Sequence, residues 1–151
     1  MKRDVFKVYL SDTGMLVHMY GAQTLAAVYR GDSSFNLGAV TENAVAESLM
    51  KCGYRPAYYA NNNGKDRMEI DFVVEFFGGP VAIEVKSGKD RESPSIKKVQ
   101  DRFKVFRRVM LENSNINVDG DGILHCPLFA SAFFDSLDDK PGFLRTPVKR
   151  L

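Results

Sequence analysis

The amino-acid sequence predicts an α/β domain, because two kinds of periodicity occur in one chain. Residues 69–77 and 81–87 alternate between apolar and polar side chains, the period of a β-strand with one buried face. Residues 36–52 and 94–110 carry apolar side chains at spacings of three and four, the period of an amphipathic helix. Strands and long helices in one chain indicate a sheet with helices packed on it.

Length and composition narrow the class of protein. The 151 residues, of which 44% are hydrophobic, suit one globular domain over residues 1–151, with a core over 5–135 and a tail over 136–151. The formal net charge of +2 is too small to indicate a partner. Neither the P-loop spacing nor the Rossmann fingerprint occurs, so no nucleotide site of those kinds is expected.

Cysteine usage and hydropathy indicate a cytoplasmic protein. Cys52 and Cys126 have no CxxC spacing and no clustered histidines, which argues against a disulfide framework and a zinc site. Both are expected to be buried thiols in a reducing compartment. No apolar run approaches transmembrane length, and the residues after Met1 lack the hydrophobic region of a signal peptide. No membrane partner is therefore expected.

The N-terminal third contains a strand pattern and two short helical patterns. Residues 5–10 predict a strand, and Asp12 begins a turn or a helix. Residues 16–20 and 25–29 predict short helices separated by Gly21. The strand pattern starts almost at once, which suggests a fragment of a longer chain, although a compact small protein would begin in the same way.

The helix predicted over residues 36–52 ends at Gly53 and places a carboxylate beside its apolar stripe. The stripe consists of Leu37, Val40, Ala44, Val45 and Leu49. Glu42 lies on the flank of this stripe, where burial of a carboxylate is costly unless something pairs with it. The alternative is a glutamate near a helix N-terminus, which the helix dipole favours.

A strand over residues 55–60 and a polar turn over 61–67 lead into a predicted β-hairpin. Its apolar face comprises Ile70, Phe72, Val74 and Phe76 on the first strand and Val81, Ile83 and Val85 on the second. A two-residue loop at Gly78-Gly79 would place Asp71 opposite Lys86, Val74 opposite Ile83 and Phe76 opposite Val81. In this register Asp71, Glu84 and Lys86 converge on one patch.

The second helix pattern begins at Ser93 as N-cap and Pro94 as first residue. Its apolar face comprises Ile96, Val99, Phe103, Phe106 and Met110, and its other faces carry Lys97, Lys98, Arg102, Lys104, Arg107 and Arg108. Such a basic helix is either a solvated face or a phosphate-binding surface. Residues 113–122 form a turn-rich connector, and 123–129 predict a last strand that ends at Pro127 or lies at a sheet edge.

Several carboxylates facing one point form a hard-oxygen site suited to Mg²⁺ or Mn²⁺. A metal ion there polarises a phosphoryl oxygen and activates water, while a lysine such as Lys86 orients the nucleophile or stabilises developing charge. The alternative is a cross-strand ion pair between Asp71 and Lys86 on a solvated hairpin, contributing at most about 1 kcal/mol.

Four motifs in order carry a resemblance to known families: Lys7-Val-Tyr-Leu-Ser-Asp-Thr-Gly-Met-Leu, Thr41-Glu-Asn-Ala-Val, Glu69-Ile-Asp-Phe-Val and Ile83-Glu-Val-Lys-Ser-Gly. The acidic residues and the ExK element resemble the PD-(D/E)xK nuclease-like core of restriction endonucleases and archaeal Holliday junction resolvases. The ordered set, over about residues 5–130, is similar to an uncharacterised domain at the C-terminal end of many prokaryotic AAA-type ATPases.

The resemblance implies a restriction-endonuclease-like fold, with a central mixed β-sheet flanked by helices. It implies Glu42, Asp71 and Glu84 as metal-facing acids for Mg²⁺ or Mn²⁺, and Lys86 as the catalytic lysine. Gln100 matches a glutamine of some nuclease relatives, whereas Lys104 stands where they usually have an aromatic residue. Candidate nucleic-acid-binding residues are Lys97, Lys98, Lys104, Arg107 and Arg108.

The resemblance implies two partners, DNA and an ATPase module N-terminal to residue 1. Because AAA modules commonly form rings, it also implies that a homo-oligomer is one possible assembly. Two functions follow as expectations. One is Mg²⁺-dependent hydrolysis of DNA phosphodiester bonds, with water as nucleophile. The other is a non-catalytic regulatory domain that binds DNA or a protein and is attached to the ATPase.

Overall fold

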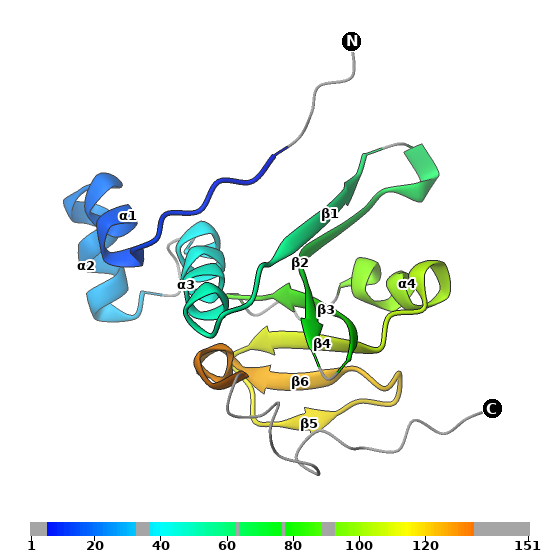
Figure 1. Ribbon diagram of the computed structural model, residues 1–151. Coiled ribbons are helices and arrows are strands. Elements are labelled where there is room, and N and C mark those ends of the chain that lie inside the picture. Colours follow the sequence, from blue (N-terminus) through cyan, green and yellow to red (C-terminus); the bar gives the residue numbers. More distant parts are fainter. Residues whose placement is uncertain (1–5, 33–36, 63, 77, 89–92, 135–151) are drawn as a thin grey trace.

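The fold is a six-stranded mixed sheet with helices on both faces, which confirms the predicted α/β class (Figure 1). The computed structural model describes residues 6–32, 37–62, 64–76, 78–88 and 93–134. In sheet order the strands are β1 (Ala57–Asn61), β2 (Met68–Phe76), β3 (Gly79–Val85), β4 (Arg107–Glu112), β6 (Leu124–Pro127) and β5 (Asn117–Val118). The pairings β3–β4 and β4–β6 are parallel, and the others are antiparallel.

Two hydrophobic clusters lie on opposite faces of the sheet. The helices are α1 (Thr13–Met19), α2 (Ala22–Arg30), α3 (Gly38–Lys51) and α4 (Pro94–Phe103), with 3₁₀ turns η1 (Gly64–Asp66) and η2 (Leu128–Phe133). Buried residues of α3 and η2 pack against one face, and those of α4 pack against the other. Helices α1 and α2 lie outside α3, away from the sheet (Figure 1).

The predicted signals for helix starts and stops are confirmed, but α1 and α2 each begin three residues before the helices predicted over 16–20 and 25–29. Asp12 caps α1 by accepting a 2.8 Å hydrogen bond from the Met15 N–H, and Gly21 separates α1 from α2 with φ of 91°. Ser93 caps α4, whose first residue is Pro94. The predicted strand over 5–10 is wrong, because residues 6–10 belong to no strand; residue 5, and residue 36 at the start of the first long helix pattern, lie outside the described residues.

The predicted hairpin register is wrong by two residues. In the structure Phe72 pairs with Ile83, Val74 with Val81 and Phe76 with Gly79, so Asp71 does not lie opposite Lys86. A shift of two residues keeps each side chain on its face, which is why apolar residues still pair. Gly79 belongs to the strand, and a Cβ there would lie 2.6 Å from the Cβ of Phe106. Gly79 is therefore required by this close contact and not by the turn. Among the described residues, the turn uses Gly78, whose φ is 77°.

A β-bulge in β2 divides the apolar face that the alternation predicts. Ala57 of β1 pairs with Val73 and Tyr59 pairs with Ile70, so β2 has one extra residue between these two pairs. Met68 and Ile70 therefore pack in the α4 cluster, whereas Phe72, Val74 and Phe76 pack in the α3 cluster. Asp71 lies within this irregular stretch, which changes the direction of its side chain relative to a regular strand.

The helix predicted over residues 94–110 is too long. Helix α4 ends at Phe103, Lys104 adopts a left-handed conformation with φ of 48°, and β4 follows. Parallel pairing with β3 and β6 buries Val109 and Leu111 on the α3 face and Met110 on the α4 face, so the strand period holds here. Phe106 and Met110 are four residues apart, as on one face of a helix, but both lie after the end of α4, and Met110 belongs to β4.

The remaining predictions are largely confirmed. β1 covers most of residues 55–60, and β6 ends at Pro127, but β5 lies beyond it, so β6 is not the edge strand. Cys126 is buried and Cys52 is only half-buried; both are free thiols. Within the described residues no helix combines the length and apolar character needed to cross a membrane.

We expect Gly79→Ala to lower the free energy of unfolding by about 1–3 kcal/mol, because its methyl group would overlap the Phe106 side chain. Urea unfolding with linear extrapolation measures this loss. The matched control is Gly88→Ala, since a Cβ at Gly88 meets nothing within 4 Å. Equal stability of the two variants would contradict the close contact between Gly79 and Phe106.

Candidate functional site

Asp71 lies at the centre of the candidate site, and both of its carboxylate oxygens make contacts there. Oδ2 accepts a 3.0 Å hydrogen bond from the backbone N–H of Val85, and Oδ1 lies 3.0 Å from Nζ of Lys7. The described β2–β3 pairs end at Phe72 and Ile83, so this side-chain bond links the two strands beyond their ladder. The site therefore lies where β2 and β3 separate.

Glu84, at the C-terminal end of β3, is a buried carboxylate with incomplete pairing. Its exposed fraction is 8%, and Oε1 lies 3.3 Å from Nζ of Lys86. Among the described residues, nothing forms a hydrogen bond with its buried Oε2 atom. Burial first, and then the negative charge of Asp71, raises the pKa of Glu84 to about 7, although Lys86 and the Ser93 hydroxyl favour the ionised form.

The third predicted acid, Glu42, reaches the site from the first turns of α3. Its Oε1 atom lies 2.8 Å from Nζ of Lys7 and also accepts a hydrogen bond from the Tyr9 hydroxyl. Nζ of Lys7 lies 3.1 Å from Oε1 of Glu69 as well. One ammonium group thus contacts Glu42, Glu69 and Asp71, which come from two different elements.

Lys7 and Tyr9 are functional-site residues that the sequence reasoning missed as such. Burial, the largest influence, lowers the pKa of Lys7, but its hydrogen bonds to Glu42 and Asp71 and their negative charges together raise it well above its usual range. Burial and the hydrogen bond to Glu42 raise the pKa of Tyr9. The alternation of Lys7-Val-Tyr was the available signal, since it places both polar groups on one side of an extended segment.

The segment that carries Lys7 is fixed to α3 by side-chain hydrogen bonds at its C-terminal end. The Leu10 N–H donates to Oδ1 of Asn43 at 2.8 Å, and Nδ2 of Asn43 donates to the Leu10 carbonyl at 3.1 Å. Thr13 donates through its N–H and its hydroxyl to Glu47 at 2.8 and 2.6 Å. These contacts set where the chain approaches the acidic residues.

The acids border a pocket of about 490 Å³ formed by the start of α3, β2, the end of β3 and the start of α4. Its lining residues are Gly38, Glu42, Arg67, Glu69, Asp71, Glu84, Val85, Lys86, Ser93, Pro94 and Ser95. All four predicted catalytic residues, Glu42, Asp71, Glu84 and Lys86, are in this set. The structure therefore brings them together, even though the predicted pairing of Asp71 with Lys86 is wrong.

The predicted nucleic-acid-binding residues do not form one helical face. Lys97 and Lys98 are exposed on α4 and Lys104 is its C-cap, whereas Arg107 and Arg108 belong to β4. Nζ of Lys97 lies 2.9 Å from Oδ2 of Asp121, and Arg108 donates to the Asp121 carbonyl. None of these five predicted nucleic-acid-binding residues is among the residues that line the acidic pocket.

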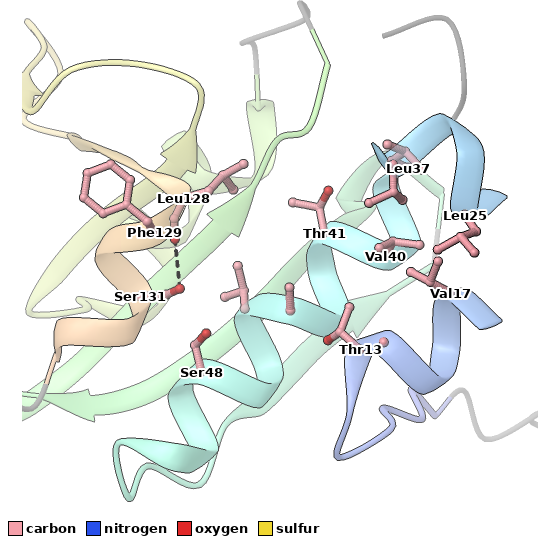
Figure 2. Close-up of a pocket in the computed structure, with 14 residues that line it drawn as sticks. Thr13, Val17, Leu25, Leu37, Val40, Thr41, Ser48, Leu128, Phe129 and Ser131 are labelled. Atoms are coloured by element: carbon pink, nitrogen blue, oxygen red, sulfur yellow. Dashed lines mark hydrogen bonds between the residues drawn. The ribbon is translucent and has the colours of Figure 1, made fainter. Parts of the chain in front are cut away.

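A second pocket, of about 580 Å³, lies between α1, α2, α3 and η2 (Figure 2). Leu25, Leu37, Val40 and Phe129 give it an apolar lining, and the Ser131 hydroxyl in it donates to the Leu128 carbonyl at 2.9 Å. No Asp, Glu, His, Lys, Arg or Cys is among its described lining residues. It offers no acid, base or metal ligand, so the acidic pocket is the candidate functional site.

The donor set fits a hydrated Mg²⁺ or Mn²⁺ ion better than a closed metal cage. Within the described ranges, no three side chains of His, Cys, Asp or Glu are arranged as a ready metal site. Mg²⁺ needs only one or two carboxylates because it retains several waters. Asp71 and Glu84 are the candidates for such a pair, and the buried Oε2 of Glu84 has no hydrogen-bond partner among the described residues. Glu42 shares its Oε1 with Lys7 and Tyr9.

Comparison with known proteins places the chain in a family. Residues 37–129, more than half of the sequence, match the model of DUF4143, a domain of unknown function. The chain belongs to this family. The matched DUF4143 segment includes Glu42, Asp71, Glu84 and Lys86, whereas Lys7 precedes it. No curated protein and no solved structure matches the chain.

We expect the stability of the protein to fall between pH 4.5 and pH 7 because of Glu84. Its pKa is raised from 4.5 to about 7 on folding, so the native state binds more protons than the unfolded state in this window. Its stabilising contribution is complete below pH 4.5 and is lost as the pH rises through about 7. Urea unfolding of Glu84→Gln should lack this loss, which is on the order of 3 kcal/mol.

The control for this titration is Glu75→Gln, which changes an exposed glutamate of the neighbouring strand β2. Glu75→Gln should retain the wild-type dependence of the free energy of unfolding on pH. If Glu84→Gln follows the same curve as the wild type, Glu84 does not have the raised pKa.

Proposed function

We propose that this DUF4143 protein is a nuclease-like domain with a PD-(D/E)xK-type core that hydrolyses DNA phosphodiester bonds with Mg²⁺ or Mn²⁺. The observation that carries the proposal is the buried Glu84 carboxylate, which has an unpartnered oxygen beside Asp71 and has Lys86 two residues further along the chain. Two adjacent carboxylates, of which one has a buried oxygen with no hydrogen-bond partner among the described residues, favour a cation as their ligand.

Each polar group of the pocket has a role in this proposal. Asp71 and Glu84 hold the ion, and Glu42 supports it from α3. A bound Mg²⁺ or Mn²⁺ ion would polarise the phosphoryl oxygen and lower the pKa of a coordinated water. Lys86, whose side chain is 28% exposed, presents its ammonium group to the pocket, where it stabilises negative charge that develops on the phosphate.

The rim of the pocket supports a phosphodiester substrate. Arg67 and the N-terminus of α4, at Pro94 and Ser95, border the same opening as the acids. A helix N-terminus and a guanidinium both favour a phosphate. The exposed Lys97, Lys98 and Lys104 follow along α4, and we propose that they contact neighbouring phosphates, whereas Arg107 and Arg108 act mainly within the sheet region.

The family supports a proposal about the native context. DUF4143 domains commonly occur with AAA-type ATPases, and the ordered motifs resemble the domain at the C-terminal end of such proteins. We therefore propose an ATPase module N-terminal to residue 1 in a cytoplasmic protein, with a homo-oligomer as the assembly that an AAA ring would impose.

A second candidate function is a non-catalytic regulatory domain that binds DNA or a protein. The contacts of Lys7 favour it, because one ammonium group already forms ion pairs with Glu42, Glu69 and Asp71 without a metal ion. In this case the acidic cluster stabilises the fold, and the exposed lysines of α4 provide the binding surface.

We expect Glu84→Gln to abolish Mn²⁺ binding in calorimetric titration and to abolish cleavage of DNA in Mn²⁺ or Mg²⁺. The substitution keeps the shape of the side chain but removes the charge that attracts the ion. The matched control is Glu75→Gln, which should bind and cleave as the wild type does. Binding of Mn²⁺ by Glu84→Gln with wild-type affinity would contradict the metal site.

We expect Lys86→Met to separate catalysis from metal binding. Cleavage of DNA should fall about 100-fold, because a positive group that stabilises the transition state is lost. The Mn²⁺ affinity should not fall, because Lys86 is not a ligand. Single-turnover cleavage and calorimetry on the same preparation test both statements. Undiminished cleavage by Lys86→Met would contradict the catalytic role of Lys86, whereas absence of cleavage by the wild type would favour the non-catalytic candidate.

A further inference from the structure

Lys7 places its ammonium group among three of the acids of the site. Its Nζ atom lies 2.8 Å from Oε1 of Glu42, 3.0 Å from Oδ1 of Asp71 and 3.1 Å from Oε1 of Glu69. The Lys7 side chain is only 17% exposed. This is the geometry of a cation surrounded by carboxylate oxygens, but the cation belongs to the protein itself.

A divalent ion and Lys7 compete for the same oxygens. Oδ2 of Asp71 is already bonded to the Val85 N–H, so Oδ1 is the oxygen that remains for a ligand, and it contacts Lys7. A divalent ion bound to Asp71 and Glu84 would also lie within a few ångströms of the Lys7 ammonium group. The double positive charge of the ion and the charge of the ammonium group would then repel each other. Their repulsion in a partly buried site opposes simultaneous binding.

The segment around Lys7 is fixed to α3 at its C-terminal end and packs on the sheet through Tyr9, whose ring centroid lies 5.4 Å from that of Phe72. Its fixed end is at Leu10 and Thr13, which are bonded to Asn43 and Glu47. On the N-terminal side of that end, Phe6 and Val8 are 76% and 74% exposed, so they add little packing. A cavity of about 220 Å³ also borders Lys7, Val8 and Tyr9. Contacts of Lys7 and Tyr9 therefore determine whether this segment stays on the acids.

We propose that Lys7 is an internal counter-cation that closes the acidic site, and that a divalent ion binds there only when the segment of residues 6–9 moves away. This inference rests on the proposed metal-binding function and adds its regulation. Occupancy of the site by metal and release of the segment are reciprocally coupled, so whatever holds the segment elsewhere also favours metal binding. Through Lys7, the described segment that precedes α1 is thus coupled to Glu42 and Asp71.

The first experiment is calorimetric titration of the full chain with MnCl₂. Lys7→Met should raise the Mn²⁺ affinity by about tenfold relative to the wild type, because the competing charge is removed. The control is Lys51→Met, which removes a lysine from an ion pair with Glu47 outside the pocket. Lys51→Met should bind Mn²⁺ as the wild type does, which separates competition at the site from a general change in net charge.

The second experiment uses the wild-type protein and so does not depend on the folding of a variant. Lysines are labelled with an amine-reactive acetylating reagent, and the rate at each residue is measured by mass spectrometry. Lys7 should be protected without metal and become labelled several-fold faster when MnCl₂ is present. Lys51, whose side chain is 71% exposed, is the internal standard and should not change.

The outcomes distinguish this inference from the function on which it rests. Stronger Mn²⁺ binding by Lys7→Met together with metal-dependent labelling of Lys7 supports the inference, even if no variant cleaves DNA, in which case only the hydrolytic function fails. Mn²⁺ binding by the wild type with an unchanged affinity in Lys7→Met and unchanged Lys7 labelling overturns the inference and leaves the metal site. Absence of Mn²⁺ binding in both proteins overturns both.

Discussion

The arrangement of the site depends on the Asp71 carboxylate, because its two oxygens accept hydrogen bonds from two different parts of the chain. One oxygen accepts from the Val85 N–H and ties β2 to the end of β3, and the other contacts Lys7 of the N-terminal segment. The same charge contributes to the raised pKa of Glu84. A bulge in β2 next to this residue interrupts the regular alternation, and bulges often re-aim a side chain near functional sites. Sheet geometry, N-terminal segment and acid–base properties thus meet at one side chain.

The convergence of Asp71, Glu84 and Lys86 could be predicted from sequence although the hairpin register could not. Side-chain faces follow from a period of two, and an error of two residues preserves them. The register depends on Gly79, which is required by packing against Phe106 rather than by the turn. Since Phe106 precedes a strand on the other side of β3, no local pattern in the hairpin reveals this constraint.

The errors elsewhere have a similar cause. The helical spacing from Phe103 to Met110 is a local property, whereas the strand β4 exists because β3 and β6 supply hydrogen-bonding partners on both sides. Lys7 contacts Glu42 and Asp71 across 35 and 64 residues of sequence. Contacts at such separations depend on the finished fold, so residue spacing indicates them only weakly. Predictions based on caps, such as Asp12 and Ser93, were correct because a cap acts within one turn.

The distribution of charge argues for a ligand-binding role rather than a purely structural network. In a network that only stabilised the fold, each buried carboxylate oxygen would have a partner, because an unsatisfied buried acceptor costs about 1–3 kcal/mol or more. Lys7 gives Glu42 and Asp71 short contacts, whereas the ion pair of Glu84 with Lys86 is 3.3 Å long and its Oε2 atom has no hydrogen-bond partner among the described residues. Proteins retain such local costs mainly where a ligand or a reaction requires them. Within the acidic pocket the imbalance lies at Glu84, the residue of the ExK element whose pKa the charge of Asp71 raises.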